Sequence, residues 1–225
     1  MNFAIVTCYN SKIEEMMHPL SQNKKEYCDR WGYKFFLKIE DWDVPYKSVG
    51  FQKIDYLINL MEENPEIDMF CWMDNDATVM NHTIPLHAFY IPETELLIGE
   101  DWNGINVGVF FIKNTKRTKD FLSKVWNYTP PITDTRPYWW CCSEQCAISD
   151  LCSTINTMVT HHSLFNGYLT EPRPGNIWNY AGLGPRNPEW KVRSFKSGDF
   201  ALHFCGEFLD KKQILIKEYM DKTIK

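Results

Sequence analysis

Residues 67–79, with the sequence IDMFCWMDNDATV, decide the fold prediction. An apolar run of strand length, Met69 to Met73, ends in two carboxylates, Asp74 and Asp76, that one residue separates. Residues i and i+2 of an extended chain share a face, so both carboxylates can converge on one ion. Hard cations such as Mg²⁺ and Mn²⁺ prefer carboxylate oxygens and keep positions open for substrate phosphates. The stretch predicts a metal–diphosphate site at the carboxyl end of a buried strand, where open α/β sheets bind ligands.

The spacing of the two carboxylates is not specific by itself. Asp41 and Asp43 have the same spacing, but a proline follows them closely and no apolar run precedes them. We interpret this second copy as a solvated loop. The apolar run before Asp74 distinguishes the first copy, and its function must be supported by other parts of the chain.

The residues before this stretch predict a β-α-β unit. Residues 3–7 form a β-branched run typical of a buried first strand, and residues 8–11 follow as a polar turn where a nucleotide base or ribose can lie. Residues 13–30 have helical spacing that is interrupted at His18-Pro19 and ends before Gly32, a residue suited to a helix C-cap. A second strand is predicted over 33–37. The order strand, helix, strand indicates a parallel sheet.

The remaining chain also alternates strands and helices. The predicted elements are a helix over 51–62, strands over 69–73, 96–99 and 109–112, a helix over 119–126, a helix capped by Ser143, a strand over 200–206 and a helix over 208–222. Residues 167–199 are rich in Pro, Gly and Asn and are predicted to form long loops over the site. A chain of 225 residues without repeats or linkers indicates one α/β domain.

Composition excludes some classes of function. A net charge of −5 without a basic patch argues against nucleic acid as a partner. No apolar run reaches the length of a transmembrane helix, and no signal peptide is recognisable. The eight cysteines form no C-x-x-C pair, so a structural zinc site is not expected, and reduced thiols are favoured over disulfides. The nine tryptophans suit either a Trp-rich core or platforms on which sugar rings stack.

Four further residues have a functional interpretation, and three of them, Lys53, Glu144 and His203, also have a structural one. Lys53 is either solvated or reaches a donor phosphate. Asn106 lies in a glycine-containing turn before a strand, where its amide can meet a sugar hydroxyl. Glu144 either caps a helix or belongs to the site. His203 lies in an apolar run, where a satisfied core histidine is more common than a metal ligand.

Four ordered stretches resemble glycosyltransferase family 34, the galactosyl-, mannosyl- and xylosyltransferases. Residues 72–77, WMDNDA, are similar to its W-M-D-S-D-A signature, and residues 104–110, GINVGVF, to its G-[IL]-N-[AT]-G-[SV]-F segment. Residues 144–145, EQ, resemble its D-Q or E-Q pair, and residues 203–206, HFCG, its H-F-x-G. Glycosyltransferase family 8 is a close relative with the same layout.

The resemblance implies a GT-A fold, an α/β domain with a mixed, mostly parallel central sheet flanked by helices. Residues 1–225 would form this single domain, with a nucleotide-binding part over about 1–115 and an acceptor-side part over about 116–225. The implied reaction moves a hexose or pentose from a UDP- or GDP-linked sugar to a glycan or glycoprotein hydroxyl, with retention of anomeric configuration.

The resemblance also assigns site residues. The metal ligands for Mn²⁺ or Mg²⁺ would be Asp74, Asp76 and His203, so the metal would join the first half of the sheet to its last strand. The donor would contact Thr7, Cys8, Tyr9, Lys53, Asn75, Asn106, Gly108 and Gly206. Gln145 would lie beside the anomeric carbon, and Glu144 would orient the sugar or acceptor.

Two departures from the family pattern affect these expectations. Family members carry a diphosphate-binding lysine just after H-F-x-G, whereas this chain has Glu207-Phe208 there, so Lys211 or Lys212 would have to replace it. The usual N-terminal Golgi anchor is also absent, which predicts a cytoplasmic enzyme of bacterial or viral type, or a soluble form of a Golgi-type enzyme. Two alternatives stay open at this stage: a metal-dependent nucleotidyltransferase or nucleotide-sugar diphosphohydrolase, and a non-catalytic carbohydrate-binding module.

Overall fold

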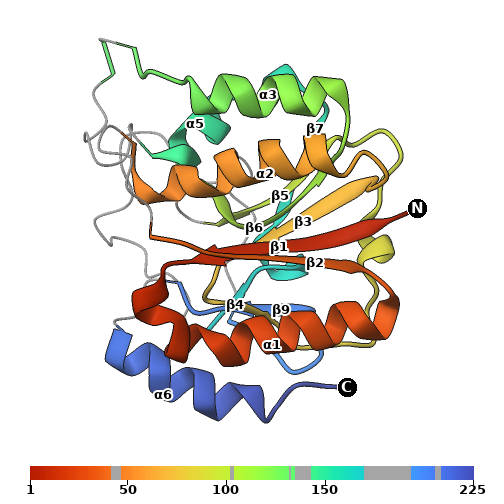
Figure 1. Cartoon of the computed structure of the whole chain (residues 1–225), viewed down its shortest axis with the longest axis vertical. Helices are drawn as coiled ribbons and strands as arrows, with labels where there is room; N and C mark the ends of the chain where they lie inside the picture. Colours follow the sequence, from red (N-terminus) through yellow and green to blue (C-terminus); the bar gives the residue numbers. More distant parts are fainter. Residues whose placement is uncertain (42–46, 102–103, 132, 135–142, 170–193, 206–208) are drawn as a thin grey trace.

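A computed structural model describes residues 1–41, 47–101, 104–131, 133–134, 143–169, 194–205 and 209–225 (Figure 1). The strands are β1 Phe3–Tyr9, β2 Lys34–Ile39, β3 Met69–Met73, β4 Ala77–Val79, β5 Leu96–Asp101, β6 Gly104–Lys113, β7 Thr157–His161, β8 Gly167–Tyr168 and β9 Ala201–His203. The α-helices are α1 Glu14–Trp31, α2 Gln52–Glu63, α3 Lys116–Trp126, α5 Glu144–Leu151 and α6 Leu209–Met220. Short 3₁₀ turns lie at Ser11–Ile13, Val49–Phe51, Leu86–Phe89, Cys152–Thr154 and His162–Leu164.

The central sheet has six strands in the order β2-β1-β3-β6-β5-β7. β1 pairs in parallel with β2 and β3, and β5 with β7, whereas β6 runs antiparallel to both β3 and β5. Helices α2, α3 and α5 lie on one side of this sheet and α1 on the other (Figure 1). Because both faces are covered, every residue of β1 and β3 is buried, as their apolar sequences predict. The mixed, mostly parallel sheet flanked by helices confirms the predicted fold class.

Helix α1 is continuous, so the predicted interruption at His18-Pro19 was wrong. Pro19 has no N–H to donate within the helix, a defect that costs about 3 kcal/mol. Met17 and Leu20 beside it are fully buried, and burying such side chains contributes about 1.5–3 kcal/mol each, which offsets the defect. The predicted end is confirmed: Gly32 has φ 70°, the left-handed conformation that ends the helix.

The first strand is longer than the sequence predicted. Residues Cys8 and Tyr9, expected in a polar turn, continue β1 and pair with Lys38 and Ile39 of β2. Both side chains are buried, Cys8 at 8 % exposed and Tyr9 at 3 %. The turn begins at Asn10, whose side chain accepts a hydrogen bond from the Lys12 N–H. The carboxyl end of β1 therefore reaches the same edge as the end of β3.

A second sheet of three strands, in the order β4-β9-β8, was not predicted. β4 begins directly after Asp76 and pairs antiparallel with β9, so that Ala77 lies opposite His203. The expectation that the last strand joins the main sheet was therefore wrong. β4 and β8 have only three and two residues, too few for a period-2 pattern to identify, whereas β9 lies within the strand predicted over 200–206. Their pairing brings a residue from near the end of the chain against the Asp74–Asp76 turn.

Candidate metal and donor site

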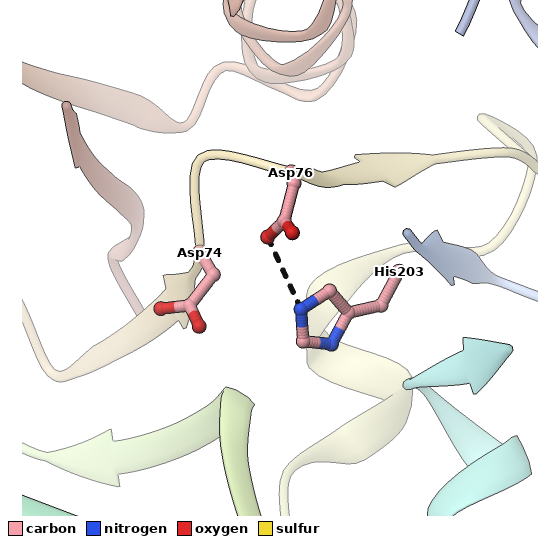
Figure 2. Close-up of side chains that lie close together, drawn as sticks. All are labelled: Asp74, Asp76 and His203. Carbon is pink, nitrogen blue, oxygen red and sulfur yellow. Dashed lines mark ion pairs between the residues drawn. The ribbon is translucent and has the colours of Figure 1, made fainter. Parts of the chain in front are cut away.

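The Asp74–Asp76 segment is a turn between β3 and β4. The Asp74 N–H donates to the carbonyl of Gly108 at 2.7 Å, and the Ala77 N–H donates to the carbonyl of Asp74 at 3.0 Å. The two carboxylates thus converge because the chain turns, and not because they share the face of one strand as the sequence suggested. The three side chains expected to bind a metal come together here: ligand atoms of Asp74, Asp76 and His203 lie within 4.8 Å of one another (Figure 2).

The Asp74 carboxylate is held from the central sheet. Its Oδ1 accepts a hydrogen bond from the indole Nε1 of Trp72 at 2.7 Å and pairs with Nζ of Lys53 at 2.9 Å. Trp72 is itself buried in β3, so its indole is fixed in place. Among the described residues, Oδ2 of Asp74 makes no hydrogen bond or ion pair.

Lys53 lies at the first turn of α2 and is only 5 % exposed, so its interpretation as a solvated lysine was wrong. Its ammonium contacts Asp74, Oε1 of Glu144 at 3.2 Å and the carbonyl of Val107 at 3.1 Å. These partners match the three donors of an ammonium group. Burial alone would lower the pKa of Lys53, but the two carboxylates raise it above its ordinary value. The lysine therefore stays charged and joins β3 to α5.

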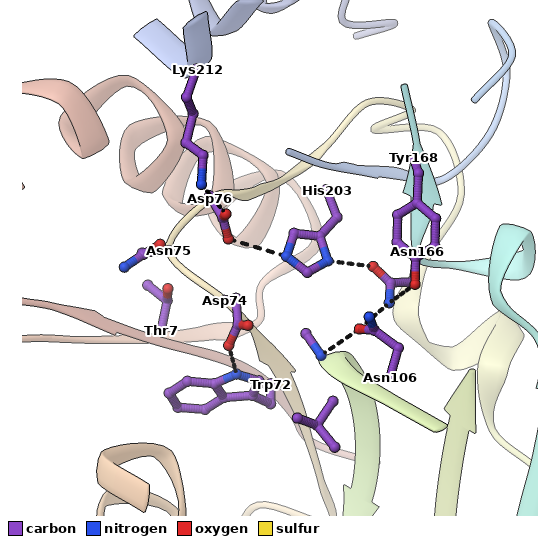
Figure 3. Close-up of polar contacts among 12 residues, drawn as sticks. Thr7, Trp72, Asp74, Asn75, Asp76, Asn106, Asn166, Tyr168, His203 and Lys212 are labelled. Carbon is purple, nitrogen blue, oxygen red and sulfur yellow. Dashed lines mark hydrogen bonds and ion pairs between the residues drawn. The ribbon is translucent and has the colours of Figure 1, made fainter. Parts of the chain in front are cut away.

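The Asp76 carboxylate is held by the far end of the chain. Its Oδ1 lies 3.1 Å from Nε2 of His203, and its Oδ2 accepts a hydrogen bond from Nζ of Lys212 at 2.6 Å (Figure 3). Burial alone would raise the pKa of Asp76, but His203 and Lys212 hold this pKa well below its ordinary value. Of the two lysines that the sequence offered as replacements for the family's diphosphate lysine, Lys212 lies at the cluster.

Sequence reasoning missed two buried residues that support the cluster. Lys24 of α1 is fully buried and donates to the carbonyls of Asp74 at 2.9 Å and Asn75 at 3.4 Å. Burial lowers the pKa of Lys24 to about 8, although the neighbouring carboxylates oppose this shift. Asn166 is also fully buried and accepts a hydrogen bond from Nδ1 of His203 at 2.9 Å. Neither residue lies in a motif, since one is a helix lysine and the other an asparagine before Gly-Tyr.

The predicted sugar-facing residues lie beside this cluster. Asn106 Oδ1 accepts from the Gly108 N–H at 2.9 Å, and Gln145 Oε1 accepts from the Val107 N–H at 3.4 Å. Ser143 caps α5 as predicted, its hydroxyl accepting from the Cys146 N–H. The cap places Gln145 against β6 and Glu144 against Lys53.

Gly108 and Gly50 mark the closest approaches of backbone to the site. A Cβ on Gly108 would lie 2.1 Å from Cε1 of His203, and a Cβ on Gly50 would lie 1.9 Å from Oε2 of Glu144. Only glycine fits at either position without displacing its neighbour. The sequence pointed to Gly108, but Gly50 follows no recognisable motif.

A cavity of about 400 Å³ opens beside the Asp74–Asp76 turn. It is lined by Cys8, Tyr9, Asn10, Ile13, Val49, Gly50, Gln52, Lys53, Trp72, Asp74, Asn75, Asp76 and Glu144. Thr7 is not a lining residue: it is fully buried, and its hydroxyl lies 3.4 Å from Nζ of Lys24. Gly206 lies outside the described residues. The cavity combines an apolar wall, an amide and the carboxylate cluster, a chemistry that suits a nucleoside diphosphate.

The cluster fits a hard divalent cation. Two carboxylates and one imidazole supply oxygen and nitrogen ligands of the kind that Mn²⁺ accepts. Ligands about 2.0–2.1 Å from an octahedral ion lie at most about 4 Å apart, so the span of 4.8 Å closes with a small side-chain movement. Asp74, Asp76 and His203 are thus the residues that would hold the ion.

Comparisons with known proteins identify the family to which the chain belongs. The family model of the galactosyl transferase GMA12/MNN10 family matches residues 1–94 and 86–212. An uncharacterised α-1,2-galactosyltransferase of Schizosaccharomyces pombe is 22 % identical, over 89 % of this chain and 58 % of that protein. A probable α-1,6-mannosyltransferase of Saccharomyces cerevisiae is 28 % identical, over 58 % of this chain and 41 % of that protein. The chain therefore spans about half the length of these relatives.

Solved structures with a similar fold are GT-A glycosyltransferases. One is a glycosyltransferase involved in glycosylation of the major capsid of PBCV-1, with a TM-score of 0.71, 18 % identity and coverage of 97 % of this chain and 100 % of that chain. Another is the galactosyltransferase LgtC with donor and acceptor sugar analogues, with a TM-score of 0.59, 11 % identity and coverage of 98 % and 95 %. Within the described residues, no helix combines the length and apolar character needed to span a bilayer. The fold is GT-A, and the chain belongs to the galactosyl transferase GMA12/MNN10 family, glycosyltransferase family 34.

Proposed function

We propose that this chain is a metal-dependent glycosyltransferase that moves a hexose or pentose from a UDP- or GDP-linked sugar to a glycan hydroxyl with retention. The observation that carries the proposal is the cluster of Asp74, Asp76 and His203 at the edge of a cavity large enough for a nucleotide. Family membership supports sugar transfer as the reaction.

The donor diphosphate would lie between the metal cluster and two lysines. Lys53 and Lys212 each contact one of the two aspartates, at 2.9 and 2.6 Å. When bound, a divalent cation offsets the charge that accumulates on the diphosphate as the glycosidic bond breaks. Both ammonium groups add positive charge at the same place, and charge placed in advance stabilises a developing anion without reorganisation.

The sugar would lie against β6 and the first turn of α5. Asn106, Gly108 and Gln145 form one polar surface there, since hydrogen bonds tie the side chains of Asn106 and Gln145 to the β6 backbone. Glu144 is joined to Lys53 and is therefore a positioning group for the sugar or acceptor in this proposal. Retention rests on the family resemblance and on the amide, not a carboxylate, that Gln145 offers beside β6.

A thermal-shift panel of nucleoside-diphosphate sugars, with and without Mn²⁺, tests the donor and the metal together. The matching donor should raise the melting temperature only in Mn²⁺, because a ligand that binds the folded state stabilises it. Full transfer activity in EDTA would contradict the metal assignment.

Product analysis separates this proposal from a diphosphohydrolase. The proposed enzyme releases a nucleoside diphosphate and places the sugar on an acceptor, and NMR of the product should show the donor's own α or β configuration. Release of a nucleoside monophosphate would instead favour hydrolysis of the diphosphate. Inversion at the anomeric carbon would contradict retention alone.

A further inference from the structure

Asn166 lies at the junction of the metal cluster and the sugar-facing surface. It follows the 3₁₀ turn His162–Leu164 and precedes β8. Its N–H donates to the carbonyl of His162 at 2.7 Å, and its own carbonyl lies 3.0 Å from the His162 ring nitrogen Nδ1. The side chain, fully buried, contacts Asn106, Tyr168 and His203 (Figure 3). Backbone and side chain are thus both fixed.

Hydrogen bonds connect Gly108, Asn106, Asn166 and His203 in series. The backbone amide of Gly108 determines which atom donates in each of them. The Gly108 N–H can only donate, so the Asn106 atom 2.9 Å away is an acceptor, Oδ1. The Asn166 atom 2.9 Å from that oxygen must then donate, which makes it the amide nitrogen Nδ2. Its other atom is therefore the carbonyl oxygen, an acceptor only. That oxygen faces Nδ1 of His203 at 2.9 Å, so Nδ1 carries a proton.

We infer that Asn166 is a positioning residue that holds His203 as the Nδ1-protonated form and presents Nε2 to the metal. Histidine metal ligands commonly donate their other N–H to a carboxylate or carbonyl, which fixes the ring and its tautomer. Here a side-chain amide does this. The Nε2 atom lies 3.1 Å from Oδ1 of Asp76, on the side of the ring that faces the cluster.

The same amide links the metal to the sugar surface. Asn166 Nδ2 orients Asn106, whose Oδ1 also accepts from Gly108, and Gly108 in turn accepts from the Asp74 N–H. A change at His203 thus reaches Asn106 through one residue. The part of this inference that concerns metal and donor rests on the proposed function, whereas the protonation of His203 does not.

NMR of the metal-free and Mg²⁺-loaded protein tests the protonation state directly. Long-range ¹H–¹⁵N correlations of ¹⁵N-histidine-labelled protein distinguish the two ring nitrogens, and His203→Gln identifies the signal among six histidines. We expect protonated Nδ1 in both states, with Nε2 unprotonated in Mg²⁺. A neutral His203 with its proton on Nε2 would overturn the inference.

Two variants distinguish the acceptor role of Asn166 toward His203 from its donor role toward Asn106. Asn166→Asp keeps an oxygen that accepts from His203 but loses the donor to Asn106, and Asn166→Leu loses both. Titration with Mn²⁺ in the absence of nucleotide-sugar measures metal affinity. The Mn²⁺ affinity of Asn166→Leu should be about 10–100-fold lower than that of wild type, whereas that of Asn166→Asp should stay within about 3-fold. Asn166→Asp should instead weaken donor binding about 10-fold, because two acceptors would face each other.

Asn81→Asp is the matched control for the buried Asn-to-Asp change. Asn81 is 9 % exposed, and it bonds to Gly198 and Thr83, neither of which belongs to the cluster. It should lower the melting temperature without changing Mn²⁺ affinity or the His203 signal. Equal Mn²⁺ affinity of Asn166→Leu and wild type, or equal losses in both Asn166 variants, would overturn the inference. A wild-type protein that binds no Mn²⁺ but has the Nδ1 proton would contradict the proposed function alone.

Discussion

The two aspartates of one short turn are held by different parts of the molecule. Asp74 is fixed from the central sheet by Trp72 and Lys53, and its side chain is 29 % exposed. Asp76 is fixed from the second sheet and α6 by His203 and Lys212, and its side chain is 12 % exposed. The cluster therefore lies between the two sheets. Residues before position 75 hold Asp74, whereas residues after position 200 hold Asp76.

Asparagine at each position should expose this difference most strongly. Asp74→Asn and Asp76→Asn should each lower transfer by more than about 100-fold, because each removes a proposed metal ligand. Asp76→Asn should also lower the free energy of unfolding by about 3–5 kcal/mol, since it leaves buried His203 and the partly buried Lys212 without their carboxylate. Asp74→Asn should cost about 1–3 kcal/mol. Urea unfolding in EDTA measures the stability loss of each variant. Equal losses would contradict the difference in support between Asp74 and Asp76.

Alanine at the two close-contact glycines should sharpen the comparison further. Gly108→Ala pushes against the ring of His203, which is buried and hydrogen-bonded on both sides, so Mn²⁺ affinity should fall about 10–100-fold. Gly50→Ala meets only the carboxylate end of Glu144, which can rotate away. Its Mn²⁺ affinity should stay within about 3-fold of wild type while the donor KM rises. Mn²⁺ titration and steady-state kinetics distinguish these outcomes, and a reversed order would refute the assigned contacts.

Lys212→Met removes the ion pair with Asp76 and leaves the contacts of Asp74 unchanged. Lys212→Met keeps the length of the side chain and removes its charge, so the donor KM should rise about 10-fold with a smaller change in kcat. Lys211→Met, a neighbouring exposed lysine, is the matched control for charge and should change KM far less. Equal effects of the two variants would indicate that net charge, and not the contact with Asp76, is responsible.

The smallest expected effect is the slow chemical modification of Cys8. Burial and the charge of Asp74 raise the pKa of Cys8 to about 12, so its thiolate is scarce at pH 8 although it lines the cavity. Iodoacetamide should therefore modify Cys8 slowly at pH 8, and the rate should rise as pH approaches the thiol pKa. Mass spectrometry of peptides locates the label, with urea-unfolded protein as the control for full reactivity. Rapid labelling of folded protein at pH 8 would contradict the raised pKa.

The sequence predicted the site where its residues carry strong chemical signals. Asp74, Asp76 and His203 belong to motifs, and the structure brings all three together. Asn166 and Lys24 were missed, because their roles arise from the direction of a hydrogen bond and from a buried helix face, and neither leaves a local pattern. The solvated alternative for Lys53 failed for the same reason: only packing against Asp74 and Glu144 shows that its charge is buried.

The fold was predicted best where elements are long and periodic. The ends of α1 and the extent of α2 followed from sequence, whereas the predicted interruption of α1 at Pro19 failed because tertiary burial outweighed a local defect. β4 and β8 were beyond pattern reasoning, since two or three residues show no period, whereas β9 was predicted as a strand but not its place in a second sheet. The division at about residue 115, the assignments of Gly206 and the cytoplasmic location stay predictions.

The pairing of Ala77 with His203 also has a consequence for the order of folding. Residues 126 positions apart must meet before the third side chain reaches the two aspartates, and contacts of such long range form slowly. During synthesis, residues 1–113 can assemble most of the central sheet well before residue 203 leaves the ribosome. The nascent chain therefore carries both aspartates without His203 until β9 docks, so the proposed metal site would be completed only late in folding.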